Sequence, residues 1–77
     1  MSKPTRITNS IRALRFARGE MTQAELAQRI GVTRQTVIAI EQGRYSPSLE
    51  VAFQIARVLK VPLDEVFQYP DGEGEPL

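Results

Sequence analysis

A run of hydrogen-bonding side chains, Thr-Arg-Gln-Thr, occupies residues 33–36 of this 77-residue chain. Arg34 and Gln35 carry several polar atoms on long stems, and they open a segment whose apolar residues recur at helical spacing. Neither falls on the apolar side of that segment. Side chains of this kind either recognise a partner through hydrogen bonds and charge, or form an ordinary solvated surface.

The composition argues against catalysis. The sequence has no Cys and no His, so it lacks a thiolate nucleophile, the usual metal ligand and the proton carrier of neutral pH. Scattered carboxylates alone supply neither a nucleophile with its base nor a metal site. A chain this short buries only about 60% of its unfolded surface and has little room for an enclosed cavity. We therefore predict a protein that is not an enzyme, with no catalytic residue, no cofactor, no metal site and no small-molecule effector pocket.

The distribution of charge divides the chain into two parts. Residues 1–60 contain all ten Lys and Arg but four of the nine acids, a net charge of +6, whereas residues 61–77 contain five acids and no base. A basic body suits a nucleic-acid partner, and an acidic end keeps a protein soluble or discourages non-specific binding. The alternative is solvated surface charge followed by a frayed tail.

Membrane and export signals are missing from the sequence. No apolar run approaches the roughly 18 residues of a membrane span, and residues 1–10 lack the hydrophobic segment of a signal peptide. We therefore predict a cytoplasmic protein with no membrane partner.

Apolar periodicity predicts an all-α fold, a five-helix bundle. The helices are predicted over residues 11–18, 23–30, 34–42, 48–60 and 62–67. Asn9 or Ser10 is positioned to cap the first helix, and Thr33 the third. Thr22 and Glu25 have the spacing of a capping box at the start of the second.

The fourth helix is predicted to form the centre of the core. Ser46 is expected to cap it, with Pro47 in its first turn. Its apolar residues cover a face too wide for a surface helix: Leu49, Ala52, Phe53, Ile55, Ala56 and Leu59.

The two ends of the chain lack this periodicity. Residues 1–8 are predicted to form an N-terminal arm, extended over residues 3–8, and strand signals are absent elsewhere. Residues 9–69 form the predicted domain. Residues 70–77 combine proline, glycine and acids, a composition typical of a flexible tail.

The second and third helices meet at Gly31, which tolerates the positive φ of a tight turn. Ala27 is small where the two helices must cross, and Val37 and Ile40 are spaced to anchor the third helix to the core. This arrangement has the shape of a helix-turn-helix unit. The outer side of the third helix then carries Arg34, Gln35, Thr36, Ile38 and Ala39.

The chain resembles the Cro and phage-repressor type of helix-turn-helix protein, also called the XRE family. The resemblance runs from Ile11 through Phe67 and rests on IRALR, TQAELAQRIGVTRQTVIAIEQGRYSPS and AFQIARVLKVPLDEVF in this order. It implies a five-helix bundle whose third helix enters the major groove of double-stranded DNA. The function implied is a sequence-specific transcriptional regulator, a repressor of its own or a neighbouring operon.

The resemblance implies that the start of the third helix reads bases, where Arg pairs bidentately with guanine and Gln with adenine. Ile38 either contacts a thymine methyl group or tucks against a neighbouring side chain. The residues assigned to base readout are Arg34, Gln35, Thr36 and Ile38.

Contacts to the DNA backbone are expected from the loop after the third helix and from helix starts. Gln23, at the start of the second helix, either lies by the phosphates or supports Gln35. The residues assigned to the backbone or to helix orientation are Gln23, Thr33, Gln42, Arg44 and Tyr45.

Arg15 and Glu41 match family positions that often form an ion pair, which would orient the third helix. The alternative is two unrelated surface charges. One departure bears on this pair: the segment RGEMTQ carries one residue more than the shortest family members have, naturally taken as Glu20, and the insertion is expected to shift Arg15 slightly.

A homodimer is expected because two recognition helices about 34 Å apart read a palindrome, whereas one small module buries too little surface for tight specific binding. An arm exchanged through Ile7 is a further route to a dimer. The dimer candidates are Leu63, Val66, Phe67 and Tyr69, of which the first three alternatively close the core.

A second function class keeps the fold as a protein-binding module, such as an antitoxin or a bridging factor. Loss of polar residues from the third helix would favour this class, and Arg34 and Gln35 count against it.

Overall fold

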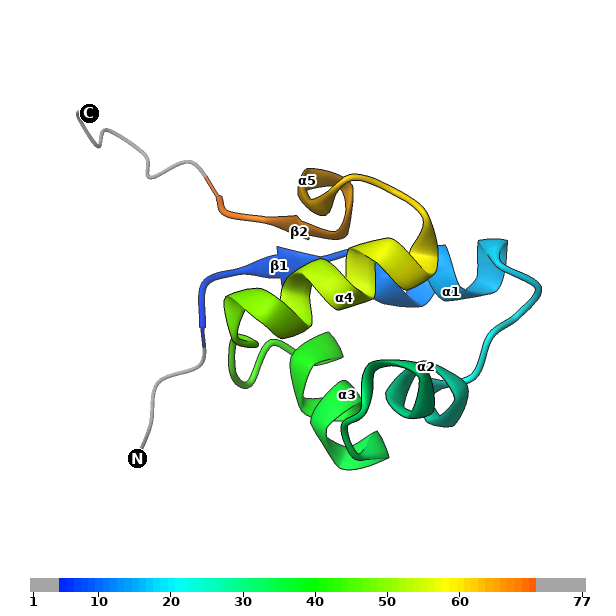
Figure 1. Ribbon diagram of the computed structural model, residues 1–77. Helices are drawn as coiled ribbons and strands as arrows, with labels where there is room; N and C mark the ends of the chain where they lie inside the picture. The colour runs from blue at the N-terminus through cyan, green and yellow to red at the C-terminus, as the bar shows by residue number, and fades with distance from the viewer. Residues whose placement is uncertain (1–4, 71–77) are drawn as a thin grey trace.

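The computed structural model describes residues 5–70, and it confirms the predicted helical bundle. In Figure 1, α4 crosses the middle of the molecule, with α2 and α3 on one side and α5 with a small sheet on the other. The helices are α1 (Ile11–Ala17), α2 (Gln23–Ile30), α3 (Arg34–Glu41), α4 (Leu49–Leu59) and α5 (Leu63–Val66), and the strands are β1 (Thr8–Asn9) and β2 (Phe67–Gln68). None of these helices is long and apolar enough to cross a bilayer.

The two-stranded sheet corrects the prediction that strands are absent apart from an extended arm. β1 and β2 pair antiparallel, with Thr8 opposite Gln68 and Asn9 opposite Phe67. The predicted fifth helix accordingly ends one residue early, because Phe67 turns into extended backbone at φ −123° and ψ 140°. Two residues per strand are too few to show an alternating pattern, and the pairing joins distant parts of the chain. The predicted tail lies outside the described residues except for Pro70.

The core draws on all five helices. The largest fully buried side chains are Ile11, Leu26, Val37, Ile40, Ile55, Leu59 and Val66. Burial of each such side chain stabilises the folded state by about 1.5–3 kcal/mol relative to leaving the side chain exposed. α3 is therefore held by Val37 and Ile40 against the rest of the bundle, as the spacing of its apolar residues predicts.

The face of α4 that packs inward is narrower than predicted. Leu49 and Phe53 are 69% and 53% exposed, which corrects their assignment to the core. The neighbouring helices cover only the arc that contains Ala52, Ile55, Ala56 and Leu59. The start of α4 also differs from the prediction: Ser48 is its cap, and its Oγ accepts a hydrogen bond from the Val51 N–H at 3.2 Å.

Two helix ends adopt left-handed backbone. Gly31, the C-cap of α2, has φ 74°, where glycine is unstrained, but Lys60, the C-cap of α4, has φ 61°. An L-residue in this region costs about 1–2 kcal/mol relative to its preferred conformations. The turn after α4 therefore stores strain that the turn after α2 avoids.

Lys60→Gly is expected to raise the free energy of unfolding by about 0.5–1 kcal/mol, because relief of the strain exceeds the extra entropy of the unfolded chain. Urea unfolding followed by circular dichroism measures the change. The control is Arg57→Gly, at a helical position of α4, which should lower stability by about 1 kcal/mol. A loss in both variants would show that Lys60 is not strained.

Candidate nucleic-acid interface

α2 and α3 form a compact unit around the turn at Gly31. The Gly31 and Val32 N–H groups both donate to the Ala27 carbonyl, which closes the end of α2. Thr33 then caps α3, and its Oγ1 accepts from the Thr36 N–H at 3.1 Å. With the inner side of α3 buried, this unit leaves the outer side of the helix free.

The outer side of α3 presents the side chains assigned to base readout. Arg34 and Gln35 are exposed at the first turn, and Ile38 is half-buried one turn later. Thr36 is also half-buried, and its hydroxyl lies 3.0 Å from that of Thr33, so it belongs in part to the cap. The free polar groups at the start of α3 are therefore those of Arg34 and Gln35.

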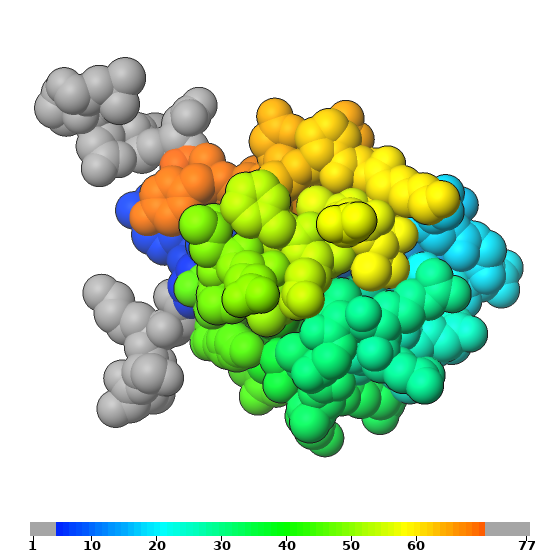
Figure 2. Space-filling view, in the orientation of Figure 1, coloured from blue at the N-terminus to red at the C-terminus, as the bar shows by residue number. Residues whose placement is uncertain are grey.

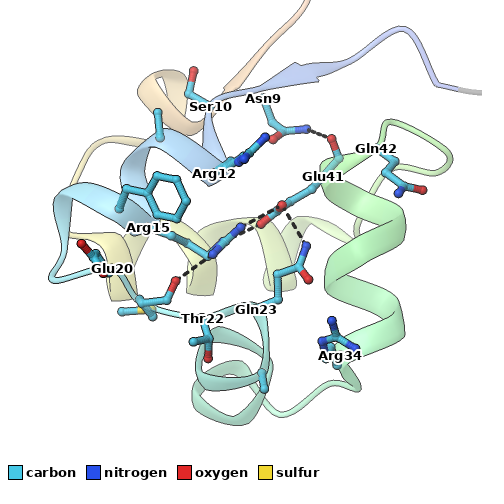
Figure 3. A pocket seen from close by; sticks show the side chains of 14 residues that line it. Asn9, Ser10, Arg12, Arg15, Glu20, Thr22, Gln23, Arg34, Glu41 and Gln42 are labelled. Atoms are coloured by element: carbon cyan, nitrogen blue, oxygen red, sulfur yellow. Dashed lines mark hydrogen bonds and ion pairs between the residues drawn. The ribbon is translucent and has the colours of Figure 1, made fainter.

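A buried ion pair holds the other end of α3. The Arg15 Nε donates to Glu41 Oε2 at 2.7 Å, and its Nη2 to Oε1 at 3.2 Å (Figure 3). These side chains are 7% and 9% exposed. Arg15 Nη1 also donates to the Met21 carbonyl at 2.7 Å. The two residues are thus not unrelated surface charges, and they connect α1 to α3 and to the turn before α2.

Gln23 takes part in the same network. Its Nε2 donates to Glu41 Oε1 at 3.1 Å, so its amide supports Glu41 rather than Gln35 (Figure 3). The added residue Glu20 does not disturb the pair, because it is taken up in the turn with φ 59° and its N–H bonds the Phe16 carbonyl at 3.1 Å. One carboxylate therefore joins α1, the start of α2 and the end of α3.

An open groove runs between α1, the start of α2 and α3, with the ion pair among its lining residues (Figure 3). Arg12 and Arg34 line it from α1 and α3. The guanidinium of Arg12 lies over the Phe16 ring, 5.6 Å from its centre, which restrains that cation by a cation–π contact. Sequence reasoning did not single out Arg12, although its place three residues before Arg15 puts both on neighbouring parts of α1. Cations beside an open groove suit an anionic chain.

The loop after α3 folds back on the helix. The Gly43 N–H donates to the Ile40 carbonyl and the Arg44 N–H to the Ala39 carbonyl, both at 3.0 Å. Gln42 and Arg44 are exposed, and Tyr45 is 42% exposed. The loop therefore holds the candidate phosphate contacts beside the C-terminal end of α3.

The residues offered as dimer contacts divide between core and surface. Val66 is fully buried within one chain, so it closes the core and cannot meet a second copy. Leu63 and Phe67 are half-buried against the core. Tyr69 is 64% exposed, with the Arg6 guanidinium 5.6 Å from the centre of its ring. Of the four, Tyr69 offers the most free surface.

Known proteins resemble this chain in fold and in sequence. The helix-turn-helix family model matches residues 11–66, from the start of α1 to the end of α5. The crystal structure of a Bacteroides fragilis protein superposes with a TM-score of 0.70 at 22% identity, covering 80% of this chain and 98% of the other. At that identity the match speaks for the fold alone.

Relatives from the sequence comparison are more similar to this chain in sequence than that crystal structure is. An HTH-type transcriptional regulator of Methanocaldococcus jannaschii is 51% identical over 53 residues, covering 69% of this chain and 80% of the relative. The cryptic phage CTXphi transcriptional repressor RstR of Vibrio cholerae is 39% identical over 59 residues, covering 77% of this chain and 52% of that protein. The family match and these relatives establish that the chain belongs to the helix-turn-helix family of transcriptional regulators.

Proposed function

We propose that this protein is a sequence-specific regulator of transcription that reads double-stranded DNA with α3 in the major groove. The observation that carries the proposal is the exposed first turn of α3. It presents Arg34 and Gln35 while Val37, Ile40 and the Glu41 network hold the helix from behind. A helix fixed in this way offers bidentate hydrogen-bonding side chains to base edges at little further cost in backbone order.

The groove and the loop after α3 supply the contacts to the DNA backbone in this proposal. Arg44 approaches phosphates from the loop, and Arg12, held over Phe16, approaches them from α1. Phosphate contacts carry no sequence information, but they set the register in which α3 meets the bases. Gln23 contributes by orienting Glu41 through its amide.

Selection of bound sequences from random duplex DNA tests the function. We expect a palindromic consensus whose half-sites lie one helical turn apart, about 34 Å, as two copies of α3 require. Binding without any enriched sequence would contradict sequence-specific readout. Absence of DNA binding would favour the protein-binding module instead.

The protein is proposed to act as a repressor. The relative from the CTXphi phage is named a transcriptional repressor, and a dimer seated on a promoter excludes polymerase from the same DNA. A reporter gene driven by a promoter that overlaps the selected sequence should be less active when the protein is present. Increased expression would identify an activator.

The proposed two-fold contact uses the apolar surface that α4 leaves uncovered. Leu49, Phe53 and Tyr69 are each more than half exposed, and Leu63 and Phe67 are half-buried. The start of α4 and the residues after β2 appear on the same face of the molecule in Figure 2. A second copy is the occupant that fits this surface best, because a palindromic site brings two chains together about a two-fold axis.

Phe53→Ser combined with Tyr69→Ser is expected to weaken self-association while each chain stays folded, because both side chains are largely exposed in the single chain. Sedimentation at several concentrations measures the change. Phe16→Ser is the matched control, since Phe16 is 52% exposed on α1, outside the proposed dimer contact. If the double variant and the wild type have the same dimer dissociation constant, the interface lies elsewhere.

A further inference from the structure

Asn9, the last residue of β1, joins three parts of the fold through one side-chain amide. Its Nδ2 donates to the Ile40 carbonyl at 3.1 Å and to the Glu41 carbonyl at 3.3 Å, the second of which is drawn in Figure 3. Its Oδ1 accepts from the Ile11 N–H at 3.1 Å. The same side chain therefore accepts from the first N–H of α1, although Ser10 is the N-cap residue of that helix, and it holds the last turn of α3.

The last turn of α3 needs such a donor. The final carbonyls of a helix have no partner within the helix, and α3 has no basic residue in its last turn. The Gly43 N–H supplies one bond to the Ile40 carbonyl. Asn9 adds a second donor there and reaches the Glu41 carbonyl as well.

The backbone around Asn9 is itself fixed from the C-terminal part of the domain. Asn9 pairs with Phe67 in the sheet, and the next N–H, that of Ser10, donates to the Val66 carbonyl at 2.9 Å. Val66 is fully buried. The amide of Asn9 is thus held between the core, the sheet and the end of α3.

We propose that Asn9 is a positioning residue that sets the orientation of α3, and with it the sequence preference of the protein. The proposal rests on the proposed function, since it concerns how α3 meets the bases. Glu41 is held by two sets of hydrogen bonds. Its carboxylate accepts from Arg15 and Gln23, and its backbone carbonyl accepts from Asn9. The two sets of hydrogen bonds come from different elements, so together they resist both rotation of α3 about its axis and tilting of that axis.

The geometry makes small tilts matter. An eight-residue helix is about 12 Å long, so a tilt of about 5° at its C-terminal end moves its first turn by about 1 Å. Hydrogen bonds to base edges keep their strength only within a few tenths of an ångström. Loss of the hydrogen bonds from Asn9 therefore weakens readout by Arg34 and Gln35, although Asn9 lies at the opposite end of the helix.

Two substitutions separate the hydrogen bonds to α3 from the hydrogen bond at the start of α1. Asn9→Asp keeps an acceptor for the Ile11 N–H and suits the start of a helix, but it turns an oxygen toward the two α3 carbonyls. Asn9→Ser also keeps a capping oxygen and adds no charge. Its side chain is too short for the hydroxyl to reach the carbonyls of α3. The matched control is Ser48→Ala, which removes a cap hydrogen bond from α4 and leaves α3 untouched.

The first measurement is the ratio of affinities for the duplex selected by the wild type and for random duplex, at a temperature where circular dichroism shows every variant folded. Both Asn9 variants should lower this ratio about tenfold. Asn9→Ser should leave random-duplex binding nearly unchanged. Ser48→Ala should lower the melting temperature and keep the wild-type ratio. An Asn9→Ser variant that loses stability but keeps the ratio would overturn the proposal.

The second measurement needs no DNA. The backbone amide resonances of α3 should shift in Asn9→Ser along the whole helix, as far as Arg34, and stay in place in Ser48→Ala. Shifts confined to residues 40–42 would overturn the positioning role. If the wild type selects no sequence, the proposed function fails, and the amide shifts still decide whether Asn9 orients α3.

Discussion

Glu41→Ala is expected to lower the free energy of unfolding by about 3–5 kcal/mol, a large share of the stability of a small domain. The Glu41 carboxylate accepts two hydrogen bonds from Arg15 and one from Gln23. Because the Arg15 side chain is only 7% exposed, the substitution leaves a guanidinium buried without a counter-charge. Urea unfolding followed by circular dichroism measures the loss.

A double substitution tests whether the buried charge is the cause. Arg15→Met with Glu41→Leu removes both charges and keeps similar volumes, so it should recover at least half of the loss. Glu50→Ala, at an exposed carboxylate in the first turn of α4, should change stability by less than about 1 kcal/mol. A loss below about 1 kcal/mol for Glu41→Ala would contradict the prediction, since that is the value of a solvated surface pair.

The second large effect is a difference between two kinds of DNA contact. Arg34→Ala and Gln35→Ala should each weaken binding to the selected sequence by about 1–3 kcal/mol and barely change binding to random duplex, because each removes a contact to a base edge. Arg44→Ala should weaken both duplexes alike. It should also reduce the slope of log affinity against log salt concentration by about one, because one fewer phosphate is neutralised.

Titration of both duplexes over a series of salt concentrations gives all of these quantities. Arg29→Ala is the control, since Arg29 is an exposed arginine in the last turn of α2 to which no DNA contact is assigned. It should match the wild type in affinity and nearly match it in salt slope. The same uniform loss in the Arg34, Gln35 and Arg44 variants would mean that α3 is only a basic surface.

Features that depend on neighbours in the chain were predictable from the sequence. The capping box of α2 is present as predicted, with the Glu25 N–H bonded to Thr22 Oγ1 and the Thr22 N–H to Glu25 Oε1. The ends of α2, the cap on α3 and the burial of Val37 and Ile40 also follow from local spacing. These signals are strong because a helix places residues three and four apart on the same side.

Features that depend on distant parts of the chain were not predictable in the same way. The exposure of Leu49 and Phe53 is decided by how far neighbouring helices reach around α4, which periodicity cannot show. The hydrogen bond from the Gln23 amide to Glu41 was not predicted, because it depends on the end of α3 packing beside the start of α2. The cap of α4 was misplaced by two residues because Ser46 and Ser48 both fit a capping position.

The candidate site also contains features that the sequence predicted and features that it did not. The resemblance to the family implied the ion pair of Arg15 and Glu41, which the structure contains. The base-reading and phosphate-contacting roles of Arg34, Gln35 and Arg44 remain predictions. The role of Asn9 escaped sequence reasoning, because an asparagine before a helix has an ordinary local explanation as a cap, and its bonds to α3 span more than thirty residues.

The pairing of β1 with β2 has a consequence for the order in which the molecule folds. It brings together residues up to 60 apart in the chain, through only two residue pairs. Closing so long a loop costs entropy that little contact surface offsets, so we expect the sheet to form after the locally connected pair α2 and α3 and to open before global unfolding. We expect each such opening to loosen the hydrogen bonds from Asn9 to α3, while the hydrogen bonds to the Glu41 carboxylate stay in place. On the proposed role of Asn9, we expect the protein to reach, well below the free energy of complete unfolding, a state in which α3 is folded but its orientation is less firmly fixed.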